Sequence, residues 1–198
     1  MNDEEGQVLH TLRCMGVSSV ERVADAAGMG VDDAEGSLIG LGAAGFVTRH
    51  GGVFGGWGVT GAGKAADARW AEREIDAAGT RGVLTEAYRE FEGLNLEVLD
   101  LCTAWQMRAG GVLNDHRDAG YDRRVLAGLV EVDGRAATLI EAMAGAAGRF
   151  RRYRERLGAA LGRVRAGETG YVTDEVGSYH GIWFQLHEDL LVTLGIPR

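Results

Sequence analysis

A short segment in the second half of the chain brings together side chains that could bind a ligand or move a proton. It lies between two predicted helices and contains Asn114, Asp115, His116 and Tyr121. Loops held on a rigid scaffold often carry binding groups. The simpler interpretation is that an aspartate of this loop caps the following helix while the other polar groups are solvated.

The last predicted helix carries the second such group. His180 and His187 are seven residues apart, which places them two turns apart on one helical face, and Trp183 lies between them. Tyr179 belongs to the adjoining apolar face. Aromatic walls with a few placed polar groups are typical of small-molecule pockets. The alternative is an ordinary core histidine that finds a hydrogen-bond partner.

We predict that the two segments, with one tryptophan of the preceding helix, form a ligand site between helices. Its predicted members are Trp105, Asn114, Asp115, His116, Tyr121, Tyr179, His180, Trp183 and His187. If the protein is an enzyme, acid–base chemistry would fall to His180, His187, Asp115 and His116.

Metal and cofactor binding are not predicted. A spacing of seven is too long for a metal pair on one helix, which requires three or four residues. No phosphate-binding glycine motif is present, and the two cysteines, Cys14 and Cys102, both fall on apolar stripes that suit packing.

Composition describes an acidic globular protein. The chain has 198 residues, 45% of them hydrophobic, and a formal net charge of −8. This charge disfavours nonspecific attraction to nucleic acid or to anionic lipid. Two cysteines without a signal peptide favour a reduced cytoplasmic protein, and no apolar run is long enough to cross a bilayer, so no membrane partner is expected.

The first third of the chain has the pattern of three helices and a hairpin. Helical periodicity predicts helices over residues 4–15, 20–27 and 31–44, and Gly28 suits the left-handed end of the second. Two β-prone runs, residues 46–50 and 57–60, flank a glycine-rich segment and predict a hairpin.

These residues resemble the MarR-type winged helix-turn-helix regulators. The resemblance is carried by residues 20–28 for the first helix of the turn, 41–47 for the end of the third helix and 57–64 for the exit from the wing. It implies a winged helix that binds DNA through its third helix and wing. The rest of the chain resembles helical domains of actinobacterial winged-helix proteins, for which no function is implied.

Charge argues against strong DNA binding. Residues 1–66 hold four lysine or arginine side chains against eight aspartate or glutamate side chains. The predicted reading helix begins with Asp32, Asp33 and Glu35, which would repel phosphate. The expected DNA contacts are therefore limited to Ser37 of that helix and to Arg49 and His50 before the wing tip.

The predicted fold is mainly α, with a winged helix-turn-helix domain (1–66) followed by an all-helical domain for ligand binding or dimerisation (67–198). Helices are expected over residues 62–77, 80–107, 121–147 and 149–166, with a last helix capped by Thr173 or Asp174 and ending near Leu194. No strand is expected after Thr60.

Two functions remain open. The first is a homodimeric, ligand-responsive transcriptional regulator that binds a small, partly aromatic molecule. The alternative is an enzyme, or a small-molecule-binding accessory protein of a biosynthetic pathway, built on a winged helix that has lost DNA binding and using a His/Asp acid–base site.

Overall fold

A computed structural model describes residues 1–52 and 55–197, and the chain forms two compact units. The first unit comprises Met1–Arg81 together with the segment from Gln185 onward, and the second comprises Gly82–Phe184. The predicted domain boundary at residue 66 falls inside a helix of the first unit. The fold is mainly helical, as the sequence predicts.

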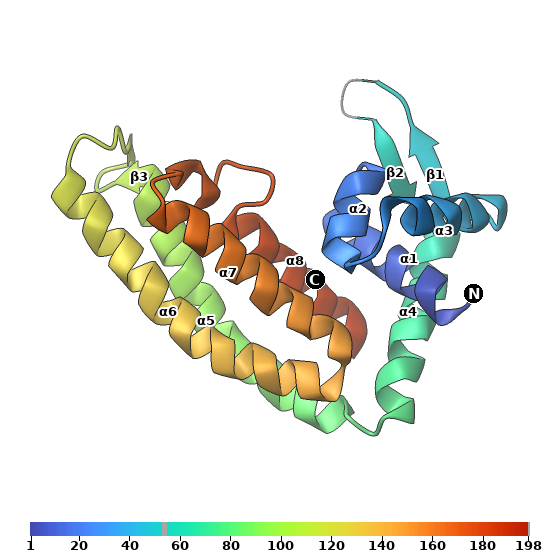
Figure 1. Cartoon of the computed structure of the whole chain (residues 1–198). Coiled ribbons are helices and arrows are strands. Elements are labelled where there is room, and N and C mark those ends of the chain that lie inside the picture. The colour runs from blue at the N-terminus through green and yellow to red at the C-terminus, as the bar shows by residue number, and fades with distance from the viewer. Residues whose placement is uncertain (53–54, 198) are drawn as a thin grey trace. The chain divides into compact units, whose positions relative to one another are not determined.

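The first unit holds three helices, a hairpin and a fourth helix, in that order (Figure 1). Their bounds are α1 (Asp3–Met15), α2 (Val20–Ala27), α3 (Val31–Ala43), β1 (Val47–His50), β2 (Gly56–Val59) and α4 (Gly61–Ala77). The bounds of α2 are those predicted, and the others differ by one or two residues. Two residues of the predicted glycine-rich wing tip, 53 and 54, lie outside the described residues.

Local chemistry fixes three of these boundaries. Asn2 and Glu5 form a capping box at the start of α1. Gly28 ends α2 at φ 73°, a left-handed conformation that favours glycine. Thr60 starts α4, because its hydroxyl oxygen accepts a hydrogen bond from the Gly63 amide at 3.1 Å.

The hairpin is tied back to the helices. Its strands pair antiparallel with Val47 opposite Val59 and His50 opposite Gly56. Trp57 also forms a bridge to Ser18, in the turn between α1 and α2. The helices and the hairpin together enclose one hydrophobic core. Its buried members are Val8, Leu9, Leu12, Val23, Leu38, Leu41, Val47 and Ala66.

The second unit is built on long helices, with one short pair of strands. Its elements are α5 (Arg81–Gln106), β3 (Met107–Arg108), β4 (Val112–Leu113), α6 (Ala119–Ala146), α7 (Arg151–Arg165) and two short 3₁₀ turns, Gly148–Phe150 and Thr169–Tyr171. The last helix, α8 (Tyr179–Leu194), belongs to the second unit as far as Phe184 and to the first unit from Gln185 onward.

Two predictions for the second half of the chain are wrong. Strands do occur after Thr60: Met107 pairs with Leu113 and Arg108 with Val112. Gly110 and Gly111, both at positive φ, reverse the chain tightly enough to close this ladder, which is too short to leave an alternating pattern in the sequence.

The start of the last helix also differs from the prediction. α8 begins at Tyr179, because the hydroxyl of Ser178, rather than Thr173 or Asp174, accepts a hydrogen bond from the Gly181 amide at 3.2 Å. The residues from 173 to 178 form turns instead. Among the described residues, none of the helices combines the length and apolar character that a membrane crossing requires.

Candidate functional site

The exposed face of α3 and the hairpin is the place where the resemblance implies DNA contact. Asp32, Asp33 and Glu35 are all solvent-exposed on α3, and Ser37 is half-buried. The predicted repulsive carboxylates therefore face solvent and not the core.

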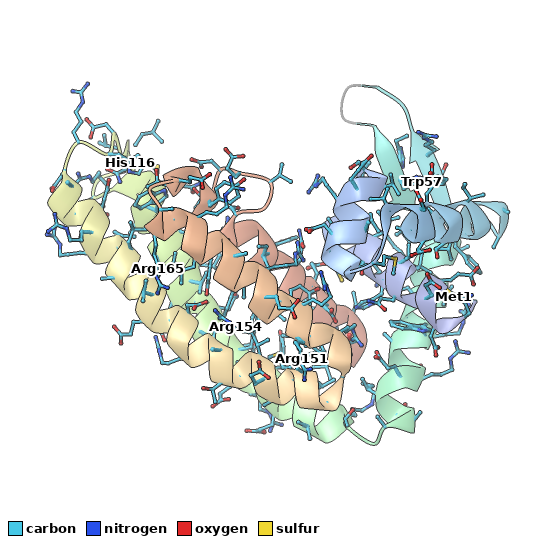
Figure 2. All side chains as sticks on the ribbon, in the orientation of Figure 1. Met1, Trp57, His116, Arg151, Arg154 and Arg165 are labelled. Atoms are coloured by element: carbon cyan, nitrogen blue, oxygen red, sulfur yellow. The ribbon has the colours of Figure 1, made fainter. Side chains whose placement is uncertain are left out.

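The hairpin contributes the cationic groups of this face. Arg49 and His50 are exposed on β1, and the Arg49 guanidinium lies 5.9 Å from the centre of the Trp57 ring (Figure 2 labels Trp57). These residues border a hollow of about 380 Å³ between the hairpin, the start of α2 and Glu35 of α3. The predicted groups Arg49 and His50 thus share one surface hollow.

Part of the predicted ligand set does come together, around the loop between α5 and α6. Asn114 is buried, and its side-chain amide donates to the Trp105 carbonyl oxygen at 3.0 Å and to Asp122 Oδ1 at 2.9 Å. His116 Nδ1 lies 3.0 Å from Asp122 Oδ2, with its ring centre 4.4 Å from that of Trp105. His116 (labelled in Figure 2) has φ 56°, a backbone strain that this hydrogen bonding holds in place.

Tyr121 completes the same cluster. Its hydroxyl donates to the Ala104 carbonyl oxygen at 2.9 Å, and the Arg108 guanidinium lies 4.0 Å from its ring centre. Asp118 caps α6 by accepting from the Tyr121 amide at 2.9 Å, and this bond, with Arg108, lowers the pKa of Asp118. Asp115 lies outside the cluster and pairs with exposed Arg117.

Tyr179 and Trp183 of α8 belong to the core of the second unit. Trp183 and Tyr179 are almost completely buried, and Trp183 stacks on Phe91 with ring centres 4.9 Å apart. The Trp183 indole N–H donates to Asn95 Oδ1 at 2.9 Å. Their apolar surface therefore packs against protein groups.

Tyr179 belongs to a polar triad with Asp133 and Arg154, of which Tyr179 and Asp133 are buried. Its hydroxyl donates to Asp133 Oδ1 at 3.2 Å, and Arg154 holds both oxygens of the same carboxylate at 2.8 and 3.0 Å (Figure 2 labels Arg154). Burial, followed by the Asp133 carboxylate, raises the pKa of Tyr179 far above its usual value. The triad joins α6, α7 and α8 within the second unit.

The two histidines of α8 fall in different units, and the described hydrogen bonds of the loop cluster do not include His180. His180 is half-buried in the second unit, and the partners of Asp115, His116 and Asp122 come from the loop, α5 and α6. His187 belongs to the first unit.

A groove between α5 and α6 offers a different place for a small molecule. It has a volume of about 520 Å³ and is lined by Glu90, Gly93, Leu94, Glu97, Arg135, Thr138, Leu139 and Ala142. Leu94 and Leu139 are buried at its floor, while Glu97 and Arg135 form an ion pair at the rim, with Nη1–Oε1 at 2.9 Å. An apolar floor with a polar rim of this volume suits a small ligand.

The first unit contains a buried charged network that the sequence analysis does not predict. The imidazole of His10 on α1 lies 2.9 Å, through Nδ1, from Asp67 Oδ1 of α4 and 3.0 Å, through Nε2, from Asp189 Oδ1 of α8. Cys14 Sγ is 3.8 Å from the same Nε2. His10, Asp67 and Asp189 are each at most 2% exposed.

Neighbouring groups complete this network. Arg13 Nη1 donates to Asp67 Oδ2 at 3.1 Å, and the Thr193 hydroxyl donates to Asp189 Oδ1 at 3.0 Å. Burial alone lowers the pKa of His10, but the interactions with Asp189, Cys14 and Asp67 outweigh it and hold that pKa well above its ordinary value. In the protonated form, the positive charges of His10 and Arg13 balance the two carboxylates.

The sequence indicates only one part of this network. His10 and Cys14 stand four residues apart, and therefore on one helical face, whereas the carboxylates come from elements distant in sequence. The chain matches no profile of a known protein family, no curated protein and no solved structure at a significant level.

Proposed function

We propose that the protein is a ligand-responsive winged-helix transcriptional regulator. The observation that carries this proposal is the arrangement of the first unit: three helices, a left-handed Gly28 between α2 and α3, and a hairpin bridged to the helices through Ser18 and Trp57. In a winged helix-turn-helix, this arrangement presents the third helix to the major groove and the hairpin to the backbone.

DNA contact in this account depends on the wing. Arg49 and His50 supply cationic or polar groups on β1, and Ser37 offers a hydroxyl on α3. The exposed carboxylates Asp32 and Asp33 oppose them, so binding is weaker and more selective than in a basic winged helix. A homodimer would compensate, because two units reading two half-sites add their contacts.

The ligand is best accommodated by the groove between α5 and α6. Its apolar floor suits the body of a small, partly aromatic molecule, and the ion pair of Glu97 and Arg135 at the rim can exchange partners with a polar group of that molecule. Gly93 faces this space with no atom within 4 Å of where its Cβ would be, so a side chain there would enter open space.

The DNA contact can be tested with matched arginine variants. Arg49→Ala should weaken binding to a selected DNA fragment. It should also reduce the slope of the logarithm of the binding constant against the logarithm of the salt concentration by about one. Arg69→Ala removes an equally exposed charge from α4 and should leave both unchanged. Equal effects of the two substitutions would contradict a wing-led contact.

The groove can be tested with matched glycine variants. Small molecules that raise the melting temperature of the wild type in a thermal-shift screen should lose that effect in Gly93→Leu. Gly134→Leu is the control, because Gly134 lies on α6, has equally open surroundings and does not line the groove. Hits that act alike on both variants would place the ligand elsewhere.

The second candidate function is an enzyme or a small-molecule-binding accessory protein, and the His116–Asp122 pair favours it. His116 is exposed, and Asp122 accepts from its Nδ1 side at 3.0 Å, which leaves Nε2 available for proton transfer. In this account His116→Gln would abolish turnover while preserving the fold, and the first unit would bind no DNA.

A further inference from the structure

The buried cluster of His10, Cys14 and Asp189 has the composition of a metal site. One donor atom from each of these three side chains lies within 4.8 Å of the other two. All three residues belong to the first unit and are buried. We propose that this cluster binds a divalent transition-metal ion of the zinc type, a property that goes beyond the proposed regulatory function and does not depend on it.

The donor spacing approaches that of tetrahedral coordination. Zinc lies about 2.0–2.1 Å from nitrogen or oxygen and about 2.3 Å from sulfur, so tetrahedral donors are separated by about 3.3–3.6 Å. In the structure, His10 Nε2 lies 3.0 Å from Asp189 Oδ1 and 3.8 Å from Cys14 Sγ. The remaining pair, Cys14 Sγ and the Asp189 carboxylate oxygen, lies within 4.8 Å, so the three donors would have to draw together around a metal.

The helical spacing of two ligands also suits a metal. His10 and Cys14 are separated by four positions on α1, so both side chains project from one face and approach the same point. Asp189 reaches that point from α8. The three side chains occupy three coordination positions and leave the fourth for water.

Outer hydrogen bonds orient the ligands in the manner of metalloproteins. Asp67 accepts from the Nδ1 side of His10 at 2.9 Å, which directs Nε2 toward Cys14 and Asp189. This carboxylate–histidine pair is the usual outer contact of a metal-bound imidazole. Arg13 and Thr193 in turn hold Asp67 and Asp189.

A glycine shapes the wall of the site. The Trp70 indole packs so closely on α1 that a Cβ at Gly6 would lie 2.2 Å from its Nε1. The same ring lies 5.7 Å from the His10 imidazole, centre to centre. The imidazole is thereby enclosed on its outer side, and its nitrogens are restricted to the two carboxylates and the thiol.

The net charge of the buried cluster does not change when a divalent metal ion binds. Without metal, protonated His10 and Arg13 balance Asp67 and Asp189. A divalent ion that replaces one proton of the imidazole and one of the Cys14 thiol leaves a neutral imidazole and a thiolate. The two positive charges gained equal the two protons released, so the buried cluster stays neutral.

The donor set selects the kind of metal. Sulfur, nitrogen and oxygen ligands together favour borderline ions such as Zn²⁺ or Co²⁺. Mg²⁺ and Ca²⁺ require oxygen ligands and would not use a thiolate or an imidazole here.

Cobalt titration of the full chain tests the proposal in the absence of DNA. After treatment with a chelator, the chain should bind one equivalent of Co²⁺ and develop a thiolate-to-cobalt charge-transfer band in the near ultraviolet. Cys14→Ser should lose this band. Cys102→Ser should keep it, because Cys102 is an equally buried cysteine of the second unit.

A second variant covers the case in which Cys14→Ser fails to fold by circular dichroism. Asp67→Asn retains all three ligands but weakens the outer contact, so Co²⁺ affinity should fall by about 10- to 100-fold while the band remains. No band in the wild type, a band that survives Cys14→Ser, or unchanged affinity in Asp67→Asn would overturn the metal site. None of these outcomes bears on whether the protein binds DNA.

Discussion

His10 Nε2 lies 3.0 Å from Asp189 Oδ1, although His10 belongs to α1 and Asp189 to α8, at opposite ends of the sequence. Both are buried, and Asp67 occupies the other nitrogen of the same imidazole. This contact joins α1 and α8 within the first unit, so the C-terminal segment is part of the structure that carries the hairpin and α3.

Loss of the Asp189 carboxylate should destabilise the metal-free protein. Asp189→Asn leaves a buried imidazolium with one carboxylate fewer, and breaking a buried pair in this way costs about 3–5 kcal/mol. Urea denaturation would measure it. Glu86→Gln is the control, because Glu86 pairs with Arg89 on the exposed face of α5 and should contribute at most about 1 kcal/mol. Similar losses in both variants would contradict the network.

The Tyr179 hydroxyl should also stabilise the second unit. Tyr179→Phe removes a hydrogen bond to the charged Asp133 and should lower the free energy of unfolding by about 1.5–3 kcal/mol. Tyr171→Phe provides the comparison, because the Tyr171 ring lies under the Arg163 guanidinium and keeps that contact without its hydroxyl. If Tyr179→Phe is neutral, Asp133 is satisfied by Arg154 alone.

Cys102 should resist alkylation in the folded protein. Burial raises the pKa of its thiol to about 11, so at pH 8 only about one molecule in a thousand carries the reactive thiolate. Labelling by iodoacetamide, measured in Cys14→Ser so that a single thiol is counted, should be slow at pH 8 and accelerate as the pH rises toward 11. Rapid labelling at pH 8 that does not require unfolding would contradict this burial.

Removing a carboxylate from α3 should strengthen DNA binding if α3 faces DNA. Asp32→Asn deletes one repulsive charge, and the affinity for a selected fragment should rise at low salt and converge with that of the wild type at high salt. Asp76→Asn, on the same unit but at the end of α4, should have no such effect. A gain common to both variants would indicate a general charge effect.

Local patterns predicted most of the helices and the hairpin. The limits of α2 follow from an apolar stripe that ends at Gly28, and the limits of β1 and β2 from β-prone runs beside glycines. The start of α8 was mispredicted because three residues before it, Thr173, Asp174 and Ser178, can all cap a helix. Which one does so depends on the turns formed by residues 173–178.

The candidate sites were predicted only where their members are close in sequence. Asn114, His116 and Tyr121 share one loop, and the structure brings them together. The partners of His10 come from α4 and α8, and no sequence pattern within α1 predicts them. Tyr179 and Trp183 are predicted as ligand contacts because they are aromatic and lie on helical faces near the two histidines, whereas tertiary packing gives them protein partners.

Selection of genomic DNA fragments by the full chain tests whether the protein is a DNA-binding regulator. Fragments bound at low salt from an unbiased genomic library should converge on a common sequence, and their affinity should fall as salt is raised, because phosphate contacts release counterions. Arg49→Ala should reduce recovery of the same fragments. Recovery of no enriched sequence at any salt concentration would contradict a winged-helix regulator.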